Sequence, residues 1–295
     1  MRVNVNDLLI RDPFVFVENG EYYLLGTTYN SSISNDYNKC VHAGSDFMLY
    51  KSRDLKVFEK VGCMVSKDTL YGYSEFWAPE LHKVNGKYYL IVSVFREDKG
   101  RGSVILVSDK INEPFTFLTG EYITPSGWSC LDATIFTYQG KNYLYFSDEW
   151  RFSVTKDGDG GIFVVELSQD LKETIGEPKK VISGKNCGFA REIADVYTGE
   201  KGYVAEGPFV KEIDGKIELY WSTFSHQGYC VVKNVAKSVF GAYEFERFVV
   251  EKDGGHAMIF TGLDKQEYIT FHQPNCPPNE RMNKFLLEGS DPNAD

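Results

Sequence analysis

Three acidic residues and a histidine recur at matching places in the sequence, each eight or nine positions before a turn residue. They are Asp12, Asp132, Glu206 and His256. Several carboxylates in one pocket allow one group to act as a proton donor while another stays ionised as a base. Cleavage of a glycosidic bond requires such a pair. The residue types and their spacing therefore indicate acid–base chemistry on a glycoside, provided that the side chains converge.

Each of the three acids would have its own role in such a site. Asp12 would activate a water molecule, Glu206 would protonate the leaving oxygen, and Asp132 would orient Glu206 and tune its pKa. A separation of roughly 6.5 to 9.5 Å between base and acid would give inversion of configuration. Taken singly, such acids are also common as turn residues or solvated caps. Three acids at matching positions favour a function, because buried like charges are costly.

Repeated hairpins would position these residues. The stretch after Pro13 contains two apolar, β-rich runs around Asn19-Gly20, which is typical of a β-hairpin. The turn residues of the five similar units are Gly20, Gly86, Gly140, Gly215 and Lys265. Because each unit of roughly 50 residues contains strand patterns only, the sequence predicts an all-β, five-bladed β-propeller. The first strand of each blade would line the central channel, where the four residues would meet.

The chain is predicted to form one catalytic propeller domain over residues 1–288, followed by a polar tail over residues 289–295. Its 295 residues, 42% hydrophobic and 25% charged, suit a globular protein with a large core. The six cysteines form no CxxC pair, so free and mostly buried thiols are expected. Three long irregular stretches are candidates for loops around a binding site: Asn30–Asp46, Cys63–Glu75 and Gly184–Val204.

Charge and hydropathy limit the partners. The net charge of −10 disfavours a nucleic-acid surface and suits a neutral ligand. No apolar run approaches the length of a membrane span, and the first seven residues lack the apolar core of a signal peptide. We therefore expect a cytoplasmic protein with neither a membrane nor a nucleic-acid partner.

Five motifs, in their order and spacing, resemble glycoside hydrolase family 43. They are Arg-Asp-Pro from Arg11, Trp-Ala-Pro-Glu from Trp77, Leu-Asp-Ala-Thr-Ile-Phe from Leu131, Glu-Gly-Pro from Glu206 and Gly-Gly-His-Ala-Met-Ile-Phe from Gly254. The resemblance extends to about Arg281. It implies a five-bladed propeller and an inverting arabinofuranosidase, β-xylosidase or arabinanase that acts on an oligosaccharide. It also places Asp12, Asp132 and Glu206 at the positions of the base, the pKa modulator and the acid.

The resemblance implies further site residues. Trp77 and Trp150 resemble positions beside the sugar, and Trp128 is a third candidate, because an indole face suits the C–H surface of a pentose. Core packing is the alternative reading of these residues. Arg281 resembles an arginine that contacts the substrate, with an ordinary surface arginine as the alternative.

His256 resembles a channel histidine near a metal, often calcium, or near a water cluster. Because calcium prefers oxygen ligands, we expect His256 to contact such a cation through water rather than directly. A satisfied core histidine is the alternative. The cation would be structural, since the chemistry itself requires no cofactor.

Two other functions compete with the removal of terminal α-L-arabinofuranosyl or β-D-xylosyl residues from plant-type polysaccharides. An endo-acting α-1,5-L-arabinanase would need an open groove. A non-catalytic carbohydrate-binding propeller would not need three titratable carboxylates on its axis. From the short segment after His272 we expect no appended β-sandwich domain. Loops of the blades, or a neighbouring subunit in a homo-oligomer, would then have to complete the pocket.

Overall fold

The computed structural model describes residues 2–28, 46–195, 198–276 and 279–287. The predicted tail over residues 289–295 lies outside these ranges, as does the predicted loop over residues 30–46 except for Asp46. Helix is confined, in the described part, to two single turns, η1 (Val5–Asp7) and η2 (Trp150–Phe152). None of the described helices is long and apolar enough to cross a membrane.

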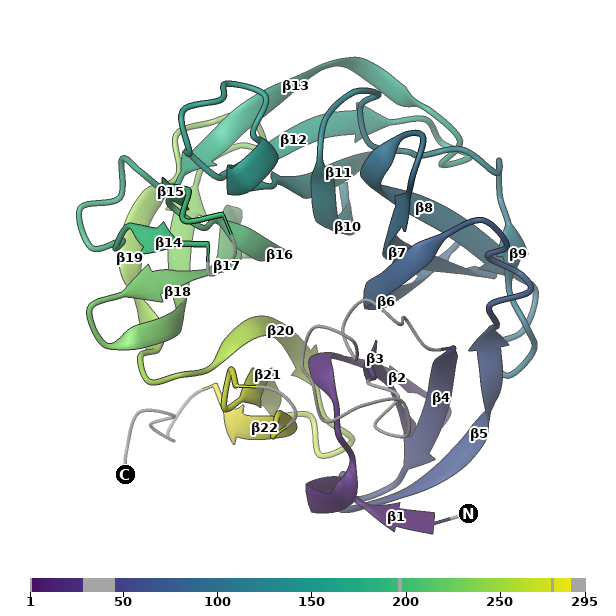
Figure 1. Ribbon diagram of the computed structural model, residues 1–295. Coiled ribbons are helices and arrows are strands. Elements are labelled where there is room, and N and C mark those ends of the chain that lie inside the picture. The colour runs from purple at the N-terminus through teal and green to yellow at the C-terminus, as the bar shows by residue number, and fades with distance from the viewer. Residues whose placement is uncertain (1, 29–45, 196–197, 277–278, 288–295) are drawn as a thin grey trace. The chain divides into compact units, whose positions relative to one another are not determined.

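The chain packs as two compact units that alternate along the sequence. The first comprises residues 1–98, 104–121 and 257–292, and the second comprises residues 99–103, 122–256 and 293–295. Each unit is built from antiparallel sheets whose neighbouring strands mostly follow one another in the chain (Figure 1). Short hairpin turns, rather than long crossovers, therefore connect most of the fold.

Three sheets belong wholly or mainly to the first unit (Figure 1). One has the order β1 (Arg2–Asn4), β5 (Val57–Val65), β4 (Phe47–Ser52), β3 (Glu21–Thr27) and β2 (Arg11–Glu18). The next contains β6 (Ser74–Val84), β7 (Lys87–Arg96), β8 (Gly100–Ser108) and β9 (Thr116–Phe117) in sequence order. The last contains β20 (Gly255–Thr261), β21 (Glu267–Gln273) and β22 (Arg281–Leu286). Strand β2 packs against both β6 and β21, which joins these sheets.

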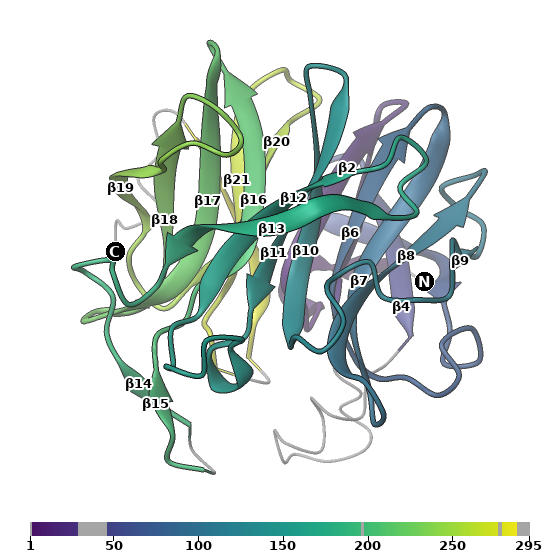
Figure 2. The same ribbon diagram turned by 90° about the horizontal axis from the view of Figure 1, so that it is seen from above.

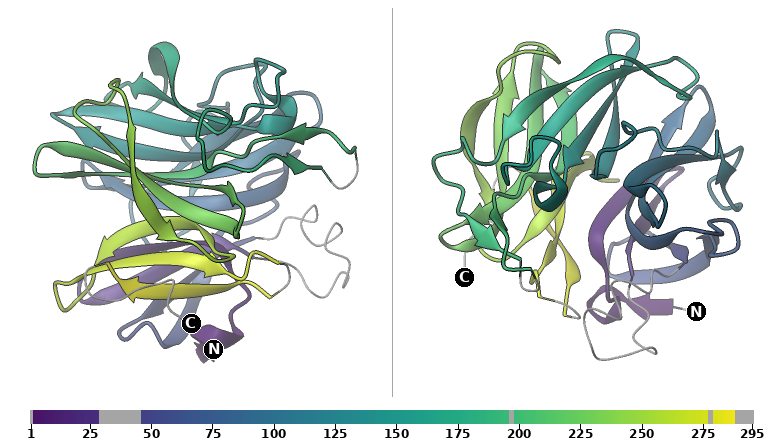
Figure 3. Two further views of the ribbon diagram at one scale, coloured as in Figure 1. Left: turned by 90° about the vertical axis from the view of Figure 1, so that its left-hand side faces the viewer. Right: turned by 45° about the horizontal axis from the view of Figure 1, so that its top comes forward.

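The second unit contains two four-stranded sheets and a small hairpin (Figures 2 and 3). One sheet has the order β10 (Cys130–Tyr138), β11 (Lys141–Asp148), β12 (Gly161–Leu167) and β13 (Thr174–Ser183). The other has the order β16 (Glu206–Ile213), β17 (Lys216–Ser225), β18 (Gly228–Ala236) and β19 (Glu244–Val250). The hairpin pairs β14 (Ile193–Ala194) with β15 (Lys201–Gly202) and projects beyond the sheet that contains β19 (Figure 2). Strand β10 packs against β16 and brings the starts of these two strands together.

These five sheets are the blades of a five-bladed β-propeller, so the predicted fold class is confirmed. The prediction of about four strands in each blade holds for three of them. The blade that contains β2 has five strands because β1 pairs with β5, and the blade that contains β20 has three strands within the described residues.

Left-handed residue pairs form the predicted hairpin turns. Asn19 and Gly20 have φ of 51° and 76°, and Asp214 and Gly215 have φ of 51° and 75°. Two consecutive left-handed residues are the geometry of the type I′ turn, whose twist matches that of paired strands. The same pairing occurs at Asn85-Gly86 and Gln139-Gly140. These dipeptides fix the register of each hairpin, and thereby the position of the strand start before it.

The core of the second unit lies between its two large sheets. Trp221, Tyr145 and Ile217 are fully buried there. The indole N–H of Trp221 donates to Asn234 Oδ1 at 2.9 Å, which satisfies its buried polar atom. This packing holds β16 and β17 rigidly behind the candidate site.

The cysteine prediction is confirmed in part. The described cysteines are free thiols: Cys63, Cys130, Cys187, Cys230 and Cys276. Only Cys130 and Cys230 among them are buried, so the expectation of mostly buried thiols is wrong for this set. Cys63, on strand β5, and Cys187 are partly exposed, and Cys276 is exposed. Cys40 lies outside the described residues.

Candidate active site

A β-bulge interrupts the start of the first strand in four blades. The register shifts fall between Arg11 and Phe14, Trp77 and Glu80, Leu131 and Thr134, and Glu206 and Phe209. The second residue of each bulge is left-handed, with φ of 51° at Asp12, 45° at Ala78, 54° at Asp132 and 59° at Gly207. Bulges of this kind redirect side chains, and left-handed residues other than glycine concentrate at functional sites.

The bulge explains why two of the predicted acids precede their turn by eight residues and Glu206 by nine. Asp12 and Asp132 occupy the left-handed position, whereas Glu206 occupies the position before it and Gly207 takes the left-handed one. His256 is also left-handed, with φ of 51°. The acids therefore leave the backbone in two different directions.

In the second unit, Asp132 is tied to the backbone beside Glu206. The N–H of Gly207 donates to Asp132 Oδ2 at 3.0 Å, and the Asp132 side chain is buried. The Tyr229 hydroxyl donates to Glu206 Oε1 at 2.6 Å, while Glu206 itself stays partly exposed. Asp132 thus fixes the bulge that aims Glu206, and Tyr229 fixes the carboxyl group.

His256 completes this group of residues. Its Nδ1 lies 3.7 Å from Asp132 Oδ2, and its backbone N–H donates to Ser222 Oγ at 2.8 Å. A Cβ atom at Gly207 would lie 3.1 Å from the His256 ring. The structure therefore brings together three of the four residues singled out in the sequence, namely Asp132, Glu206 and His256.

In the first unit, Asp12 is held by neighbours of its own. The Thr27 hydroxyl donates to Asp12 Oδ2 at 2.7 Å, and Arg11 Nε lies 3.5 Å from Oδ1. The Ala78 N–H donates to Thr27 Oγ1 at 2.7 Å. Thr27 therefore links the bulge beside Trp77 to the carboxylate of Asp12.

A buried histidine holds the backbone of Asp12. The Asp12 N–H donates to His272 Nδ1 at 3.3 Å, and His272 Nε2 lies 3.1 Å from Asn275 Oδ1. The two contacts are consistent with a neutral ring that carries its proton on Nε2. The 3.5 Å approach of Nδ1 to Asp12 Oδ1 is then a contact rather than an ion pair. His272 thus maintains the left-handed backbone that aims Asp12.

The sequence profile of the family described as "Glycosyl hydrolases family 43" matches residues 4–286. The chain belongs to glycosyl hydrolase family 43. A solved structure of an endo-arabinase from Bacteroides thetaiotaomicron VPI-5482 is similar to this family 43 chain with a TM-score of 0.84 and 31% identity. The similarity covers 99% of both chains.

Two curated relatives match over shorter stretches. An extracellular exo-α-(1→5)-L-arabinofuranosidase of Streptomyces chartreusis is 28% identical over 163 residues, which is 54% of this chain and 46% of that protein. An α-L-arabinofuranosidase of Humicola insolens is 28% identical over 165 residues, which is 54% of this chain and 32% of that protein. The match thus spans about half of the first relative and a third of the second.

Trp77 and Arg281 lie with Asp12 in the first unit of the family 43 chain. Trp77 is partly exposed and directly precedes Ala78, whose N–H bonds Thr27. Arg281 donates from Nε to the carbonyl of Asn6 at 2.7 Å and from Nη1 to that of Glu280 at 2.8 Å. The contact of Trp77 with a sugar stays a prediction. The two bonds give Arg281 a structural role, and its contact with substrate stays a prediction as well.

The two other tryptophans lie in the second unit. The Trp128 ring meets Phe163 edge to face at 5.0 Å and Phe146 at 6.2 Å, which is aromatic packing of the blade. Trp150 lies in η2, where its side chain fills the space that a Cβ at Gly202 would need. Both indoles remain partly exposed, and their contact with a sugar stays a prediction.

The described residues include no group of three or more His, Cys, Asp or Glu side chains placed to hold a metal ion. His256 has the Asp132 carboxylate beside it, whereas calcium takes roughly six to eight oxygen ligands. The residues described do not form a direct coordination sphere around His256. Contact with a cation through water stays a prediction.

Arg101 is a further charged residue near the site that the sequence does not reveal. It is buried in the second unit, with Nε 3.6 Å from Glu149 Oε2. Burial lowers the pKa of Arg101 to about 10, while the charges of Glu149 and Asp132 act in the opposite direction. Its cation adds positive potential beside Asp132. The sequence around it, Gly100-Arg101-Gly102, carries no motif that predicts this position.

Proposed function

We propose that this family 43 chain is an inverting glycoside hydrolase that removes terminal α-L-arabinofuranosyl or β-D-xylosyl residues from plant-type oligosaccharides and polysaccharides. The observation that carries the proposal is the hydrogen bond from Gly207 N–H to Asp132, directly beside Glu206. It joins two of the three predicted catalytic carboxyl groups through one backbone unit.

Glu206 is the proposed general acid. Its carboxyl group is partly exposed and meets the Tyr229 hydroxyl on Oε1, so a defined oxygen is aimed at the leaving group. Asp132 is buried and acts through Gly207 and His256 as a positioning residue. General acid catalysis by a side chain placed in this way contributes roughly 10² to 10⁴ in rate.

Asp12 is the proposed general base. Thr27 occupies one carboxylate oxygen and Arg11 lies beside the other, which leaves the carboxylate fixed in one orientation. Inversion requires this carboxylate to activate water on the face of the sugar opposite to the acid. The carbohydrate, a neutral molecule, suits the acidic chain with a net charge of −10.

Arabinose is the favoured sugar, because the relatives named above are an endo-arabinase and two arabinofuranosidases. The similarity to the endo-arabinase covers 99% of both chains, and it favours one second candidate, an endo-acting arabinanase. The two candidates share the catalytic residues and differ in the products that they release.

The test is a panel of an aryl α-L-arabinofuranoside, an aryl β-D-xyloside and linear arabinan, each incubated with the wild type, Asp12→Asn and Glu206→Gln. We expect both variants to lose roughly 10²-fold or more in kcat on the sugar that the wild type accepts. Glu244→Gln, at an exposed position on β19, is the matched control and keeps wild-type turnover. Wild-type rates in both site variants would contradict the assignment.

Product size distinguishes the candidates. An exo-acting enzyme releases monosaccharide from arabinan at the first time points and cleaves the aryl arabinofuranoside. An endo-acting enzyme releases oligosaccharides first and leaves the aryl monoglycoside nearly intact.

A further inference from the structure

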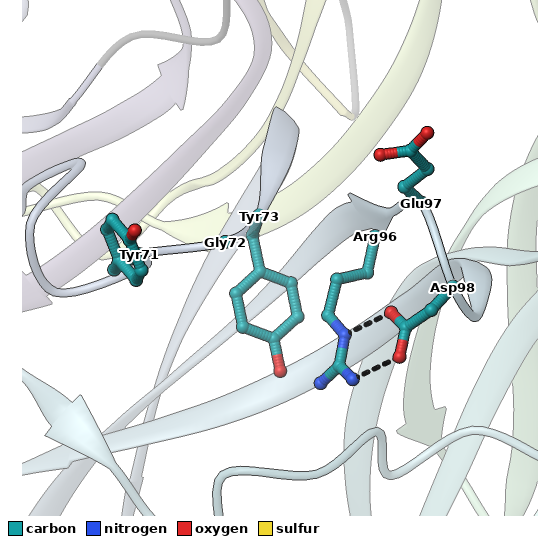
Figure 4. A pocket seen from close by; sticks show the side chains of 6 residues that line it. All are labelled: Tyr71, Gly72, Tyr73, Arg96, Glu97 and Asp98. Atoms are coloured by element: carbon teal, nitrogen blue, oxygen red, sulfur yellow. Dashed lines mark hydrogen bonds and ion pairs between the residues drawn. The ribbon is translucent and has the colours of Figure 1, made fainter.

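A cavity of about 510 Å³ lies in the first unit. It is at the open end of the β6–β7 hairpin, away from the turn that joins the two strands. It is lined by Tyr71, Gly72, Tyr73, Arg96, Glu97 and Asp98 (Figure 4). The first three residues precede β6 and the last three end β7 or follow it. Its volume lies within the range of roughly 300 to 1,000 Å³ that small-molecule sites occupy.

One wall of the cavity is held rigidly. Arg96 donates from Nε and Nη2 to the two oxygens of Asp98 at 2.6 and 2.5 Å (Figure 4). The guanidinium carbon lies 5.7 Å from the centre of the Tyr73 ring. The Tyr73 hydroxyl donates to the carbonyl of Gly120 at 3.3 Å, and its ring packs on Phe117 at 5.7 Å. Polar groups oriented in this way recognise a ligand without first having to be ordered.

The other wall is an aromatic ring that the protein leaves in solvent. Tyr71 is 90% exposed, the largest exposed fraction among the large hydrophobic side chains described. Gly72 between the two tyrosines has φ of 85°, a left-handed turn that separates their rings. An exposed aromatic face suits the C–H surface of a sugar ring. Tyr71 and the Arg96–Asp98 pair thus offer an apolar face and hydrogen-bonding groups to one ligand.

The cavity lies at the same end of the blade as Trp77. Ser74 pairs with Phe95 and Trp77 with Ser93, so Tyr73 and Arg96 come directly beyond the last pair. Along an extended strand, the four positions from Tyr73 to Trp77 span at most roughly 13 Å. An oligosaccharide of a few units covers such a distance.

We propose that this cavity is a distal subsite, which binds one sugar unit of a neutral oligosaccharide while another unit of the same chain lies against Trp77. The proposal rests on the proposed function. Tyr71 stacks on the sugar ring, and Arg96, Glu97 and Asp98 bond its hydroxyl groups. One cation and two carboxylates line the cavity, which disfavours an acidic sugar. The subsite gives the enzyme a preference for longer substrates.

The experiment compares Tyr71→Ala and Tyr71→Phe with the wild type on linear α-1,5-arabino-octaose and on an aryl α-L-arabinofuranoside. We expect the ratio of kcat/KM for the octaose to that for the aryl glycoside to fall about five- to tenfold in Tyr71→Ala, as for loss of an aromatic anchor. Tyr71→Phe keeps the ring and restores the ratio. Ile175→Ala, which removes a 52% exposed side chain on β13, is the control and keeps the wild-type ratio.

Binding of the octaose to the Glu206→Gln background, measured by calorimetry, separates this proposal from the proposed function. A Kd that rises about five- to tenfold on adding Tyr71→Ala supports the subsite even if the wild type cleaves no arabinoside. An unchanged Kd together with an unchanged kcat/KM ratio overturns the subsite while leaving the hydrolase assignment intact. Wild type that neither binds nor cleaves the octaose overturns the subsite, and it overturns the hydrolase assignment as well if neither aryl glycoside is cleaved.

Discussion

Thr27 is not one of the three proposed catalytic acids, but it holds one of them, Asp12, in place. Its hydroxyl donates to Asp12 and accepts from Ala78 N–H, both at 2.7 Å, and the side chain is buried. We predict that Thr27→Val lowers kcat roughly 10-fold or more by releasing Asp12, and destabilises the fold by about 1–3 kcal/mol through the unsatisfied N–H. Thr27→Ser, which keeps the hydroxyl, should restore both kcat and the free energy of unfolding. Loss of activity in Thr27→Ser equal to that in Thr27→Val would contradict this role.

Asp148 provides a pH-dependent test in the second unit. Burial raises the pKa of Asp148 to about 6, although the Val154 N–H donates to its Oδ2 and acts in the opposite direction. Its Oδ1 is buried and meets no hydrogen-bond donor among the described residues. Because the folded state holds this proton more tightly than the unfolded state, the stability contributed by Asp148 is present below pH 4 and is lost as pH rises through 6.

We predict that Asp148→Asn removes this loss. Relative to the wild type, the free energy of unfolding of the variant should rise by up to about 3 kcal/mol between pH 4 and pH 8. Denaturant titrations at several pH values measure the slope. Asp157→Asn is the control, because hydrogen bonding, chiefly from Thr155, lowers the pKa of Asp157. The stability that Asp157 contributes is therefore lost only at pH below its usual pKa and stays nearly constant between pH 4 and pH 8. A difference between Asp148→Asn and the wild type that does not change with pH would contradict the assignment.

At the scale of residues, the sequence predicts the acids but not their partners. Asp12, Asp132 and Glu206 stand out because repeats place them at matching offsets. Thr27, Tyr229 and His272 lie on neighbouring strands, and their contacts depend on strand register, for which no sequence motif exists. For Arg281, the sequence motif suggested contact with substrate but did not predict the hydrogen bonds that the side chain donates to the Asn6 and Glu280 carbonyls.

At the scale of elements, the β-bulge at the start of a blade's first strand sets the direction of the proposed catalytic side chains. The left-handed residue redirects the chain at Asp12 and Asp132, and glycine takes the same place at Gly207. A Cβ at Gly207 would be strained by the φ of 59° and would lie 3.1 Å from the His256 ring, a tight contact. Gly215 in the same blade has φ of 75° but open space around it.

We predict that Gly207→Ala lowers kcat more than 10-fold and destabilises the fold by roughly 1–3 kcal/mol, because strain and the displaced histidine act together. Gly215→Ala should cost only the backbone term, about 1–2 kcal/mol, and keep full kcat. Thermal unfolding and steady-state rates of both variants provide the comparison. Equal activity in the two variants would show that the bulge does not orient Glu206.

Hairpins were predictable from sequence, whereas bulges and small insertions were not. Asn-Gly and Asp-Gly dipeptides between apolar runs specify the turns directly. A bulge leaves the alternation of apolar residues almost intact on either side, so the sequence showed it only as an offset of nine instead of eight. The β14–β15 hairpin is only two residues long on each side, too short for a periodic pattern.

At the scale of the whole molecule, the fold class followed from five repeats that contain strands and no helix pattern. The similarity to the endo-arabinase over 99% of both chains agrees with that reading. The chain has the same three acids in either candidate function, so the motifs do not distinguish exo from endo action. Loops determine that difference, and loop conformation depends on contacts that are remote in sequence.

Asp12 and Glu206 are proposed to act as a base and an acid in a single displacement by water. The most direct test is the anomeric configuration of the first product, followed by proton NMR during hydrolysis of an aryl α-L-arabinofuranoside, or of an aryl β-D-xyloside if that is the accepted sugar. We expect inversion, so the α-arabinoside gives β-L-arabinose, and a β-xyloside gives α-D-xylose, before mutarotation. Initial release of the anomer that the substrate carried, α-L-arabinose or β-D-xylose, would mean retention and would contradict the role of Asp12 in activating water.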